Sequence, residues 1–427
     1  MKKTSILLSV AVVLVLFTGC IGDAGGSAPA AAVQQPKAAP VVLSLMLNSP
    51  ELTEQYREMT NAYEAYMPGV EIKMDIRQSD YSTVLKTRLN SGDIPDLFAT
   101  SAYNDNRLYQ SYLYPLTDEP FIQGIEPSML GGVTENGVIT GCPFLVQSHS
   151  FIYNKEIFKF ANITALPTTL EEYRSACEAL VQIRVQPFST GFDDWWILPQ
   201  IFYPSMSDVY AGNYPQLFAD AQNGVIQMGD LPETDFALDV LDLVSQYGGN
   251  DPMASDFDRQ CADFAAGRVA MIHQGSWAEQ TILGLNPNLQ FGYLKAPRLD
   301  GRGVLAVDSN LTLRVYKGSP HLNATLAFLN WLITSEYGRR WIPERVKQLS
   351  PLKAASVPVT PLALQTSGAM KVNDTCVWWL FAGPDDVEQP LGLALQEYVS
   401  GSLSREQVKE TITAVFAPQA AAQQPAG

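Results

Sequence analysis

Trp277 is the residue whose type and position most directly indicate a binding function. It follows closely on the strand-like segment Arg268–His273, so its side chain is expected just beyond the carboxyl end of a strand. In open α/β sheets, ligands bind at this edge. An indole ring held there can stack on an apolar face of a ligand at low entropic cost. The structural alternative is a ring that only covers the end of the sheet.

The segments around this tryptophan set its expected position. Gly267 suits the left-handed residue that closes a helix. Arg268–His273 then alternates outward and inward, as in a half-buried strand. Gly275 is expected to end the strand, and Ser276 with Glu279 three residues later forms the pattern of a capping box at the start of the next helix.

The sequence contains no pattern of a known catalytic or metal centre: GxSxG, GxGxxG, a Walker loop, HExxH and EF-hand patterns are all absent. The pairs Asp193-Asp194 and Asp385-Asp386 have the residue types of a glycosidase acid and nucleophile, but sequence neighbours rarely converge on one bond. His273, inside a predicted strand, is expected to be a hydrogen-bonded core histidine. We therefore predict a protein that is not an enzyme and has neither a cofactor nor a metal site.

The N-terminus has the pattern of an export signal. Lys2 and Lys3 precede the apolar run Ile6–Phe17, which is too short to span a bilayer comfortably. The run ends in Phe17-Thr18-Gly19-Cys20, which resembles a lipobox with Phe17 in the usual place of Leu. Residues 1–19 are therefore predicted to be a lipoprotein signal peptide, and Cys20 the lipidated first residue of an extracytoplasmic protein anchored to the cell membrane.

Composition separates a globular body from two low-complexity ends. Residues 20–40 are predicted to be a flexible tether and residues 417–427 a disordered tail, because they contain almost no large apolar side chain. The body is too long for one core and indicates two lobes. The net charge of −16 argues against nucleic acid and anionic ligands, so the partners should be neutral or cationic. Four cysteines form no CxxC motif and are expected to be buried free thiols, although a disulfide stays open: Cys142, Cys177, Cys261 and Cys376.

The body begins with alternating strands and helices. Strand, helix, strand, helix and strand are predicted in that order between Val41 and Thr100. This order implies a largely parallel sheet with right-handed crossovers. The loops after its strands then share one edge, where polar side chains and Tyr103 gather.

Five segments of the chain, in order, resemble signature segments of one family. They are RLNSGDIPDLFAT (Arg88–Thr100), YLYPLTD (Tyr112–Asp118), FIYNKEIFKFANITALPTTLEEY (Phe151–Tyr173), FAAGRVAMIHQGSW (Phe264–Trp277) and SPHLNATLAFLNWLITSEYGRRW (Ser319–Trp341). The chain thus resembles the extracellular solute-binding proteins of carbohydrate importers of the ATP-binding cassette type, the group that includes maltose-binding protein. The resemblance runs from about Val41 to Phe416.

The resemblance implies an α/β, two-lobed periplasmic-binding-protein-like fold of type II. Each lobe would be a mainly parallel sheet flanked by helices, with the ligand in the cleft between the lobes. The chain would cross between the lobes near 144–149, near 303–309 and after Pro343. Lobe 1 would then hold residues 41–147 with about 306–345, and lobe 2 residues 148–305 with about 346–416.

Family positions also imply aromatic contacts with the ligand. Trp277 corresponds to a stacking residue, and the pairs Trp195-Trp196 and Trp378-Trp379 stand where the family often places further aromatic side chains. Their rings would match the C–H faces of sugar rings. Of each pair we expect one ring at the cleft, Trp195 and Trp378, and the neighbouring ring in the core.

Polar side chains complete the expected site. The loop after the strand that ends at Thr100 corresponds to a cleft loop of the family. Amides and carboxylates there would accept hydrogen bonds from sugar hydroxyls, and a solvated or capping role is the alternative for the carboxylates. The predicted polar contacts are Asn48, Asp80, Thr100, Ser101, Tyr103, Asp194 and Asp308.

The favoured function is a membrane-tethered receptor that captures a mono- or oligosaccharide by hinge closure and delivers it to the permease of an importer. A second hypothesis keeps the scaffold and replaces the sugar by a polyamine, because acidic and aromatic clefts also bind cations. A third is a surface lipoprotein without a transport function. A freely hinged receptor is expected to be a monomer.

Overall fold

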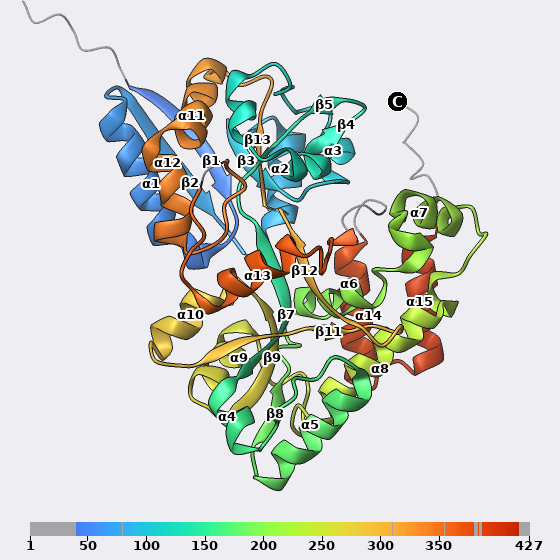
Figure 1. The fold of residues 1–427 in the computed structure, drawn as a ribbon. Helices are drawn as coiled ribbons and strands as arrows, with labels where there is room; N and C mark the ends of the chain where they lie inside the picture. Colours follow the sequence, from blue (N-terminus) through green and yellow to red (C-terminus); the bar gives the residue numbers. More distant parts are fainter. Residues whose placement is uncertain are drawn as a thin grey trace, which may run out of the picture. The chain divides into compact units, whose positions relative to one another are not determined.

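The computed structural model describes residues 40–417, apart from residues 79, 310, 354, 380–382 and 384–386. Pro40–Gly427 forms one compact unit, in which two sheets each carry helices and apolar cores (Figure 1). The expectations for residues 1–19, Cys20, the tether, the tail and Asp385-Asp386 concern residues outside this part of the chain, apart from Pro40 and Ala417 at its ends. Among the described residues, no helix is both long and apolar enough to cross a membrane.

The first sheet is built largely from the N-terminal part of the chain. Its strands and flanking helices are β1 (Val41–Leu47), α1 (Thr53–Tyr66), β2 (Val70–Ile76), α2 (Tyr81–Ser91), β3 (Leu97–Thr100), β6 (Cys142–Pro143), β13 (Thr312–Val315), α11 (Leu322–Thr334) and α12 (Glu336–Trp341). The short helix α3 (Asp105–Leu108) and the hairpin of β4 (Thr134–Glu135) and β5 (Val138–Ile139) lie beside this sheet. The predicted alternation of strands and helices up to Thr100 is confirmed.

The second sheet is built from the middle of the chain. Its strands are β7 (Gln147–Asn154), β8 (Gln186–Ser189), β9 (Val269–Gly275), β10 (Phe291–Leu294), β11 (Ala296–Pro297), β12 (Gly303–Asp308) and β14 (Thr375–Cys376). The helices of this lobe are α4 (Lys155–Phe160), α5 (Leu170–Gln182), α6 (Phe202–Ser205), α7 (Tyr214–Gln222), α8 (Pro232–Gln246), α9 (Phe257–Ala265), α10 (Ala278–Leu285), α13 (Pro361–Lys371), α14 (Glu388–Val399) and α15 (Arg405–Phe416).

Strand pairing is mixed in both sheets. All strands of the first sheet except β13 run in the same direction, as expected for a mainly parallel sheet. In the first sheet, β1 pairs in parallel with β2 and β3, but β13 is antiparallel to β3 and β6. In the second sheet, β7 is antiparallel to β9, β10 and β12. The reason lies in the connections, because β13 and β7 enter their sheets from the other lobe and not through a helical crossover.

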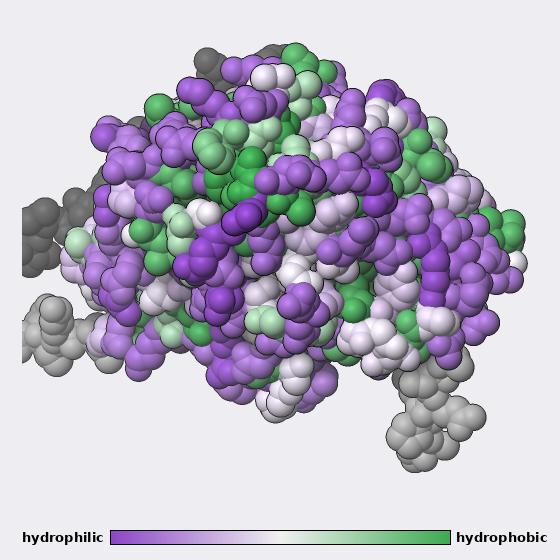
Figure 2. Space-filling view, turned by 90° about the horizontal axis from the view of Figure 1, so that it is seen from below, coloured by the Kyte–Doolittle hydropathy of each residue, from purple (hydrophilic) through white to green (hydrophobic). Residues whose placement is uncertain are grey.

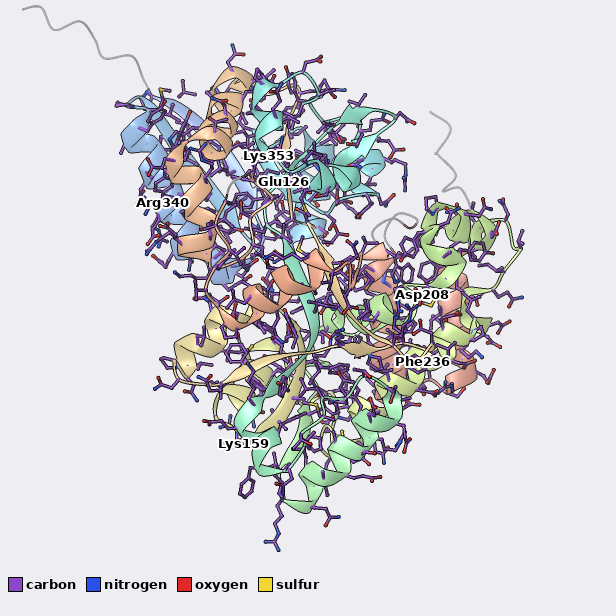
Figure 3. The ribbon with its side chains drawn as sticks, in the orientation of Figure 1. Glu126, Lys159, Asp208, Phe236, Arg340 and Lys353 are labelled. Atoms are coloured by element: carbon purple, nitrogen blue, oxygen red, sulfur yellow. The ribbon has the colours of Figure 1, made fainter. Side chains whose placement is uncertain are left out.

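The chain passes between the two lobes at three places. The first lies between β6 and β7. β12 belongs to the second sheet through Asp308, so the second crossing lies between Asp308 and Thr312. Leu352 packs in the first core, and Lys353 N–H donates to the carbonyl of Gly124 at 2.8 Å beside Glu126 (Figure 3). The third crossing therefore follows this segment.

β9 is buried at all seven positions, so the expected half-buried alternation was wrong. It lies between β7 and β8, where both of its faces are covered. Gly267 has a φ of +70° after the end of α9, which confirms its predicted role in closing a helix.

The described cysteines are free thiols, and the surface is mostly hydrophilic. All four cysteines are buried and free, as predicted, and burial raises the pKa of the Cys142 thiol to about 12. Hydrophilic residues cover most of the face drawn in Figure 2, and hydrophobic ones gather in a few areas.

Candidate ligand-binding site

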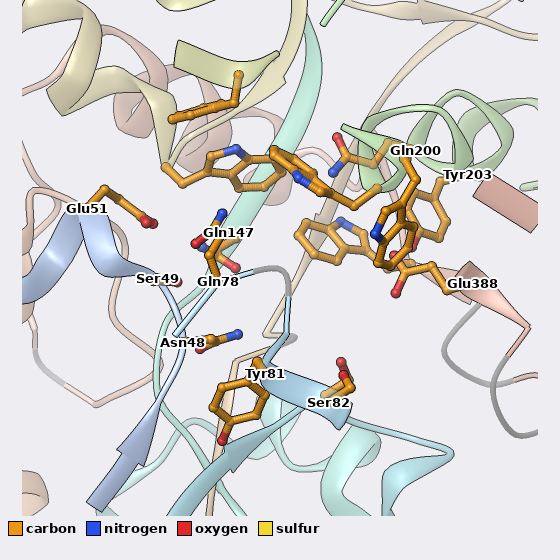
Figure 4. Close-up of a pocket in the computed structure, with 16 residues that line it drawn as sticks. Asn48, Ser49, Glu51, Gln78, Tyr81, Ser82, Gln147, Gln200, Tyr203 and Glu388 are labelled. Carbon is orange, nitrogen blue, oxygen red and sulfur yellow. The ribbon is translucent and has the colours of Figure 1, made fainter. Parts of the chain in front are cut away.

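A cavity of about 260 Å³ lies between the two lobes (Figure 4). The first lobe lines it with Asn48, Ser49, Glu51, Gln78, Tyr81, Ser82 and Ser101. The second lobe and the crossing strand β7 contribute Gln147, Trp195, Trp196, Gln200, Tyr203, Phe257, Trp277, Trp378 and Glu388. One side of the cavity is therefore rich in indole rings, and amide, hydroxyl and carboxylate groups come from both lobes.

The indole rings hold one another in place. The Trp277 ring meets Trp196 at a centroid distance of 6.2 Å and Trp378 at 5.9 Å, both edge to face. Trp277 Nε1–H donates to Gln274 Oε1 at 2.7 Å. Edge-to-face pairs are a favoured geometry of aromatic rings. The wall of the cavity is therefore organised before any ligand arrives.

Trp277 is positioned by tertiary contacts and not by the predicted capping box. α10 begins at Ala278, and Trp277 is its N-cap residue without a side-chain cap. The Glu279 carboxylate instead accepts from Thr360 Oγ1 at 2.7 Å and from Leu362 N–H at 2.8 Å. These bonds cap α13 and tie it to the helix that carries Trp277.

Gly275 is required beneath this ring. It is the last residue of β9, as predicted, and a Cβ atom built on it would lie 2.2 Å from Trp277 Cζ3 and 2.6 Å from the carbonyl oxygen of Ser148. Real Cβ atoms do not come so close to other heavy atoms, so any larger residue must displace the indole ring.

We expect Gly275→Ala to weaken ligand binding and to destabilise the fold by about 1–3 kcal/mol, the usual range for overpacking a tight site. Gly284→Ala is the matched control, because a Cβ at Gly284 in α10 meets nothing within 4 Å. Urea unfolding and calorimetric titration of both variants measure the two effects. Wild-type affinity in Gly275→Ala would mean that the position of the Trp277 ring does not matter for binding.

Five predicted contacts line the cavity, namely Asn48, Ser101, Trp195, Trp277 and Trp378. Asn48 Oδ1 is buried and has no hydrogen-bond partner among the described residues, and the same holds for Gln200 Oε1. Two amide oxygens beside the cavity thus have unused acceptor capacity, although neither oxygen is exposed.

The other five predicted contacts are not among the lining residues. Asp80 pairs with Arg77 at 2.7 Å near the surface, and Thr100 Oγ1 accepts from the buried Arg314 at 2.8 Å. The remaining three predicted contacts form hydrogen bonds with other segments near the cavity. They are Tyr103, Asp194 and Asp308.

Asp308 is the central member of this group. Its carboxylate accepts from Tyr103 Oη at 3.0 Å, from Trp378 N–H at 3.2 Å and from Ser309 N–H at 2.7 Å. Tyr103 lies in the first lobe, so Asp308 links that lobe to the segment that carries Trp378. Asp194 similarly accepts from Phe257 N–H at 2.8 Å and fixes the loop before Trp195.

The expectation of one cleft ring in each tryptophan pair holds for only one pair. Trp379 is buried in the core and donates to the carbonyl of Tyr203 at 3.2 Å, while Trp378 lines the cavity. Trp195 and Trp196 both line it, so the core assignment of Trp196 was wrong. They lie in a 3-10 turn, Trp195–Ile197, at the edge of the cavity.

Sequence reasoning missed two carboxylates of the cavity. Burial raises the pKa of Glu51 and of Glu388 from 4.5 to about 7. Tyr203 Oη donates to Glu388 Oε1 at 3.4 Å. The other lining residues that no sequence pattern indicated are Ser49, Gln78, Tyr81, Ser82, Gln147, Gln200, Tyr203 and Phe257.

Two histidines lie behind the indole rings. His149 is fully buried, with its ring 5.1 Å from Trp378 and 5.6 Å from His273. Burial lowers the pKa of His149 well below its usual value and that of His273 to about 3, so both stay neutral at physiological pH. His273 is a core residue as predicted, but its nitrogens lack hydrogen-bond partners in the described part of the chain and its contacts are with rings.

Within the described ranges, no group of three or more His, Cys, Asp and Glu side chains is arranged to hold a metal ion. The site offers stacking rings and hydrogen-bonding groups that come from two lobes. A two-lobed α/β chain with such a cavity between its lobes has the architecture of a solute-binding receptor.

Comparison with known proteins gives the same class. The family of bacterial extracellular solute-binding proteins matches residues 58–357, and the chain belongs to this family. It is similar to the multiple sugar-binding protein of Streptococcus mutans, with 24% identity over 77% of this chain and 81% of the relative. It is also similar to the melibiose/raffinose/stachyose-binding protein MelE of Bacillus subtilis, with 22% identity over 84% of this chain and 81% of the relative. Among solved structures, RafE in complex with raffinose, a protein known from Streptococcus pneumoniae, has a TM-score of 0.76 and 18% identity over 88% of this chain and 98% of its own.

Proposed function

We propose that this protein binds a mono- or oligosaccharide in the cavity between its lobes and delivers it to the permease of an importer of the ATP-binding cassette type. The cavity itself carries the proposal, because it combines four indole rings with amide, hydroxyl and carboxylate groups. Sugar rings need both, since they present C–H faces to aromatic planes and hydroxyls to polar groups. Two relatives are named as sugar-binding proteins, which supports the same ligand class.

Closure follows from the division of the contacts between the lobes. Asn48 and Gln78 belong to the first lobe, whereas Trp195 and Trp277 belong to the second. A ligand that touches both sets binds more tightly to the closed form than to the open form and therefore shifts the population towards closure. The permease would recognise that closed form. The lipid on Cys20 and the tether over residues 20–40 would keep the receptor near the membrane, outside the cytoplasm.

The cavity offers no catalytic arrangement within the described residues. Its carboxylates, Glu51 and Glu388, come from different lobes, and both histidines lie behind the indole wall with strongly lowered pKa values. We therefore assign binding and release to this site and no bond cleavage. The small volume favours a ligand of one or two rings.

A thermal-shift screen of residues 36–420 against mono- and oligosaccharides, with polyamines and amino acids as controls, tests the proposal. A ligand at about 100 times its Kd stabilises the folded protein by about 2.7 kcal/mol and raises its Tm by several degrees. We expect this rise with one class of sugar. A cooperative melt that no sugar shifts would contradict the proposal.

A further inference from the structure

The charge of the cavity is entirely negative within the described part of the chain. Among its lining residues, Glu51 and Glu388 are acidic, and none is Lys, Arg or His. Glu51 comes from the first lobe and Glu388 from the first turn of α14 in the second. Figure 4 shows them on opposite sides of the cavity, with Gln78 and Gln147 between them.

Neither carboxylate has a cationic partner among the described residues. No ion pair of either side chain occurs there, and the neighbours that affect them are Ser49 for Glu51, and Tyr203 and the acidic Asp105 for Glu388. An anion removed from water without a counter-charge is costly, and the raised pKa values of both groups reflect that cost. A positive charge on the ligand would offset this free-energy cost.

The indole wall suits the same kind of group. A cation within about 6 Å of an indole face is attracted by the ring quadrupole, and tryptophan is the best of the aromatic residues for this contact. Trp196, Trp277 and Trp378 meet edge to face, so their ring planes turn towards different directions around the cavity. A cation can thus approach a ring face while it pairs with a carboxylate.

The amide groups of the cavity favour a saccharide over a simple polyamine. Gln200 is 6% exposed, and its Oε1 has no hydrogen-bond partner within the described ranges. Asn48 Oδ1 likewise has no hydrogen-bond partner there. Amide side chains also carry N–H donors, which need acceptors on the ligand. Sugar hydroxyls both donate and accept, whereas the ammonium groups and methylene chain of a polyamine accept nothing.

We propose that the preferred ligand is a basic saccharide, an amino sugar of one or two rings whose protonated amine pairs with Glu51 or Glu388. This inference rests on the sugar-binding function proposed above. It adds that the amine, and not a further hydroxyl, is the group that the two carboxylates select.

Calorimetric titration of residues 36–420 with matched sugars tests it. Glucosamine, galactosamine and mannosamine, and their β-linked disaccharides where available, are each compared with the N-acetylated and the parent neutral sugar. We expect at least one amino sugar to bind about tenfold or more tightly than its two neutral counterparts, and higher salt to weaken only the amino sugar. Equal or tighter binding of neutral sugars would overturn the inference and leave sugar binding intact. Binding of polyamines alone would overturn both.

Charge-removing variants locate the selective group. Glu51→Gln and Glu388→Gln keep the size and hydrogen-bonding capacity of each side chain and remove its charge. In at least one of them, the ratio of amino-sugar to N-acetyl-sugar affinity should fall towards one. Glu344→Gln is the control, since Glu344 pairs with Arg340 at the surface and should leave the ratio as in the wild type. An unchanged ratio in both cavity variants would contradict the inference, and the wild-type titrations decide it if a variant fails to fold.

Discussion

Trp277→Ala is expected to cause the largest loss of ligand affinity of any single change. Trp277 lines the cavity and is the ring that contacts Trp196, Trp378 and His149 at centroid distances of 6.2, 5.9 and 6.4 Å. Its removal takes away a stacking surface and also frees the neighbouring rings to move. Central aromatic residues of this kind contribute at least about 2 kcal/mol to binding, so we expect a Kd increase of roughly 30-fold or more. Calorimetric titration with the sugar that gives the largest thermal shift measures it.

The same variant should also lose stability, but less than the roughly 3–5 kcal/mol of a fully buried ring, because Trp277 is only half-buried. Trp341→Phe separates the two effects. Trp341 is 1% exposed in the first core, where it stacks on Phe144 at 5.8 Å. We expect this control to lower the free energy of unfolding and to leave affinity unchanged. Normal affinity in Trp277→Ala with lowered stability would assign Trp277 to the core alone.

The sequence predicts well those features that depend on local patterns. The apolar runs before Asn48 and around Phe98 became β1 and β3, and the position of Trp277 after a strand was correct. The family resemblance supplied the two lobes, which no local pattern encodes. The antiparallel pairing of β13 was not predicted, because the direction of this strand depends on a chain that arrives from the other lobe.

Contacts between distant segments explain the errors in the site. Glu279 satisfies a capping-box pattern, yet Thr360 and Leu362, about eighty residues away, bind its carboxylate. Glu51 stands in the first turn of the short helix Pro50–Leu52, where the helix dipole favours an acidic side chain and no local pattern indicates a binding role. Only the fold brings it to the same cavity as Glu388. Asp308 was predicted as a polar contact of the ligand, but its carboxylate accepts hydrogen bonds from Tyr103 and Trp378 and does not line the cavity.

The unliganded protein should lose stability from its two cavity carboxylates as the pH rises. The pKa of Glu51 and of Glu388 is raised from 4.5 to about 7, so each group binds its proton more tightly in the folded protein than in the unfolded chain. Their contribution to the free energy of unfolding is therefore greatest below pH 4.5 and falls as the pH approaches about 7. Each pKa difference corresponds to a loss of at most about 3 kcal/mol.

The buried histidines change the free energy of unfolding in the opposite direction over part of this pH range. The pKa of His273 is lowered to about 3 and that of His149 also lies well below 6.5, so both oppose folding as the pH falls below 6.5. The stability curve of the wild type therefore mixes two trends. A comparison with Glu51→Gln and Glu388→Gln removes the histidine contribution, because it is common to all three proteins.

We expect the free energies of unfolding in urea to differ little between the wild type and each glutamine variant at about pH 5, where the carboxyl groups are mostly protonated. At about pH 8 each variant should have gained about 2 kcal/mol of stability over the wild type, compared with the difference at pH 5, because an uncharged amide replaces a partly buried anion. Glu344→Gln should show no such divergence, since the surface Arg340 holds the pKa of Glu344 below its usual value. A difference in the free energy of unfolding that stays constant across the pH range would contradict the raised pKa values of the two cavity carboxyl groups. If the difference grows instead, a cationic ligand should stabilise the wild type at pH 8 more than it stabilises either variant, because only the wild type has two partly buried carboxylates without a cationic partner among the described residues.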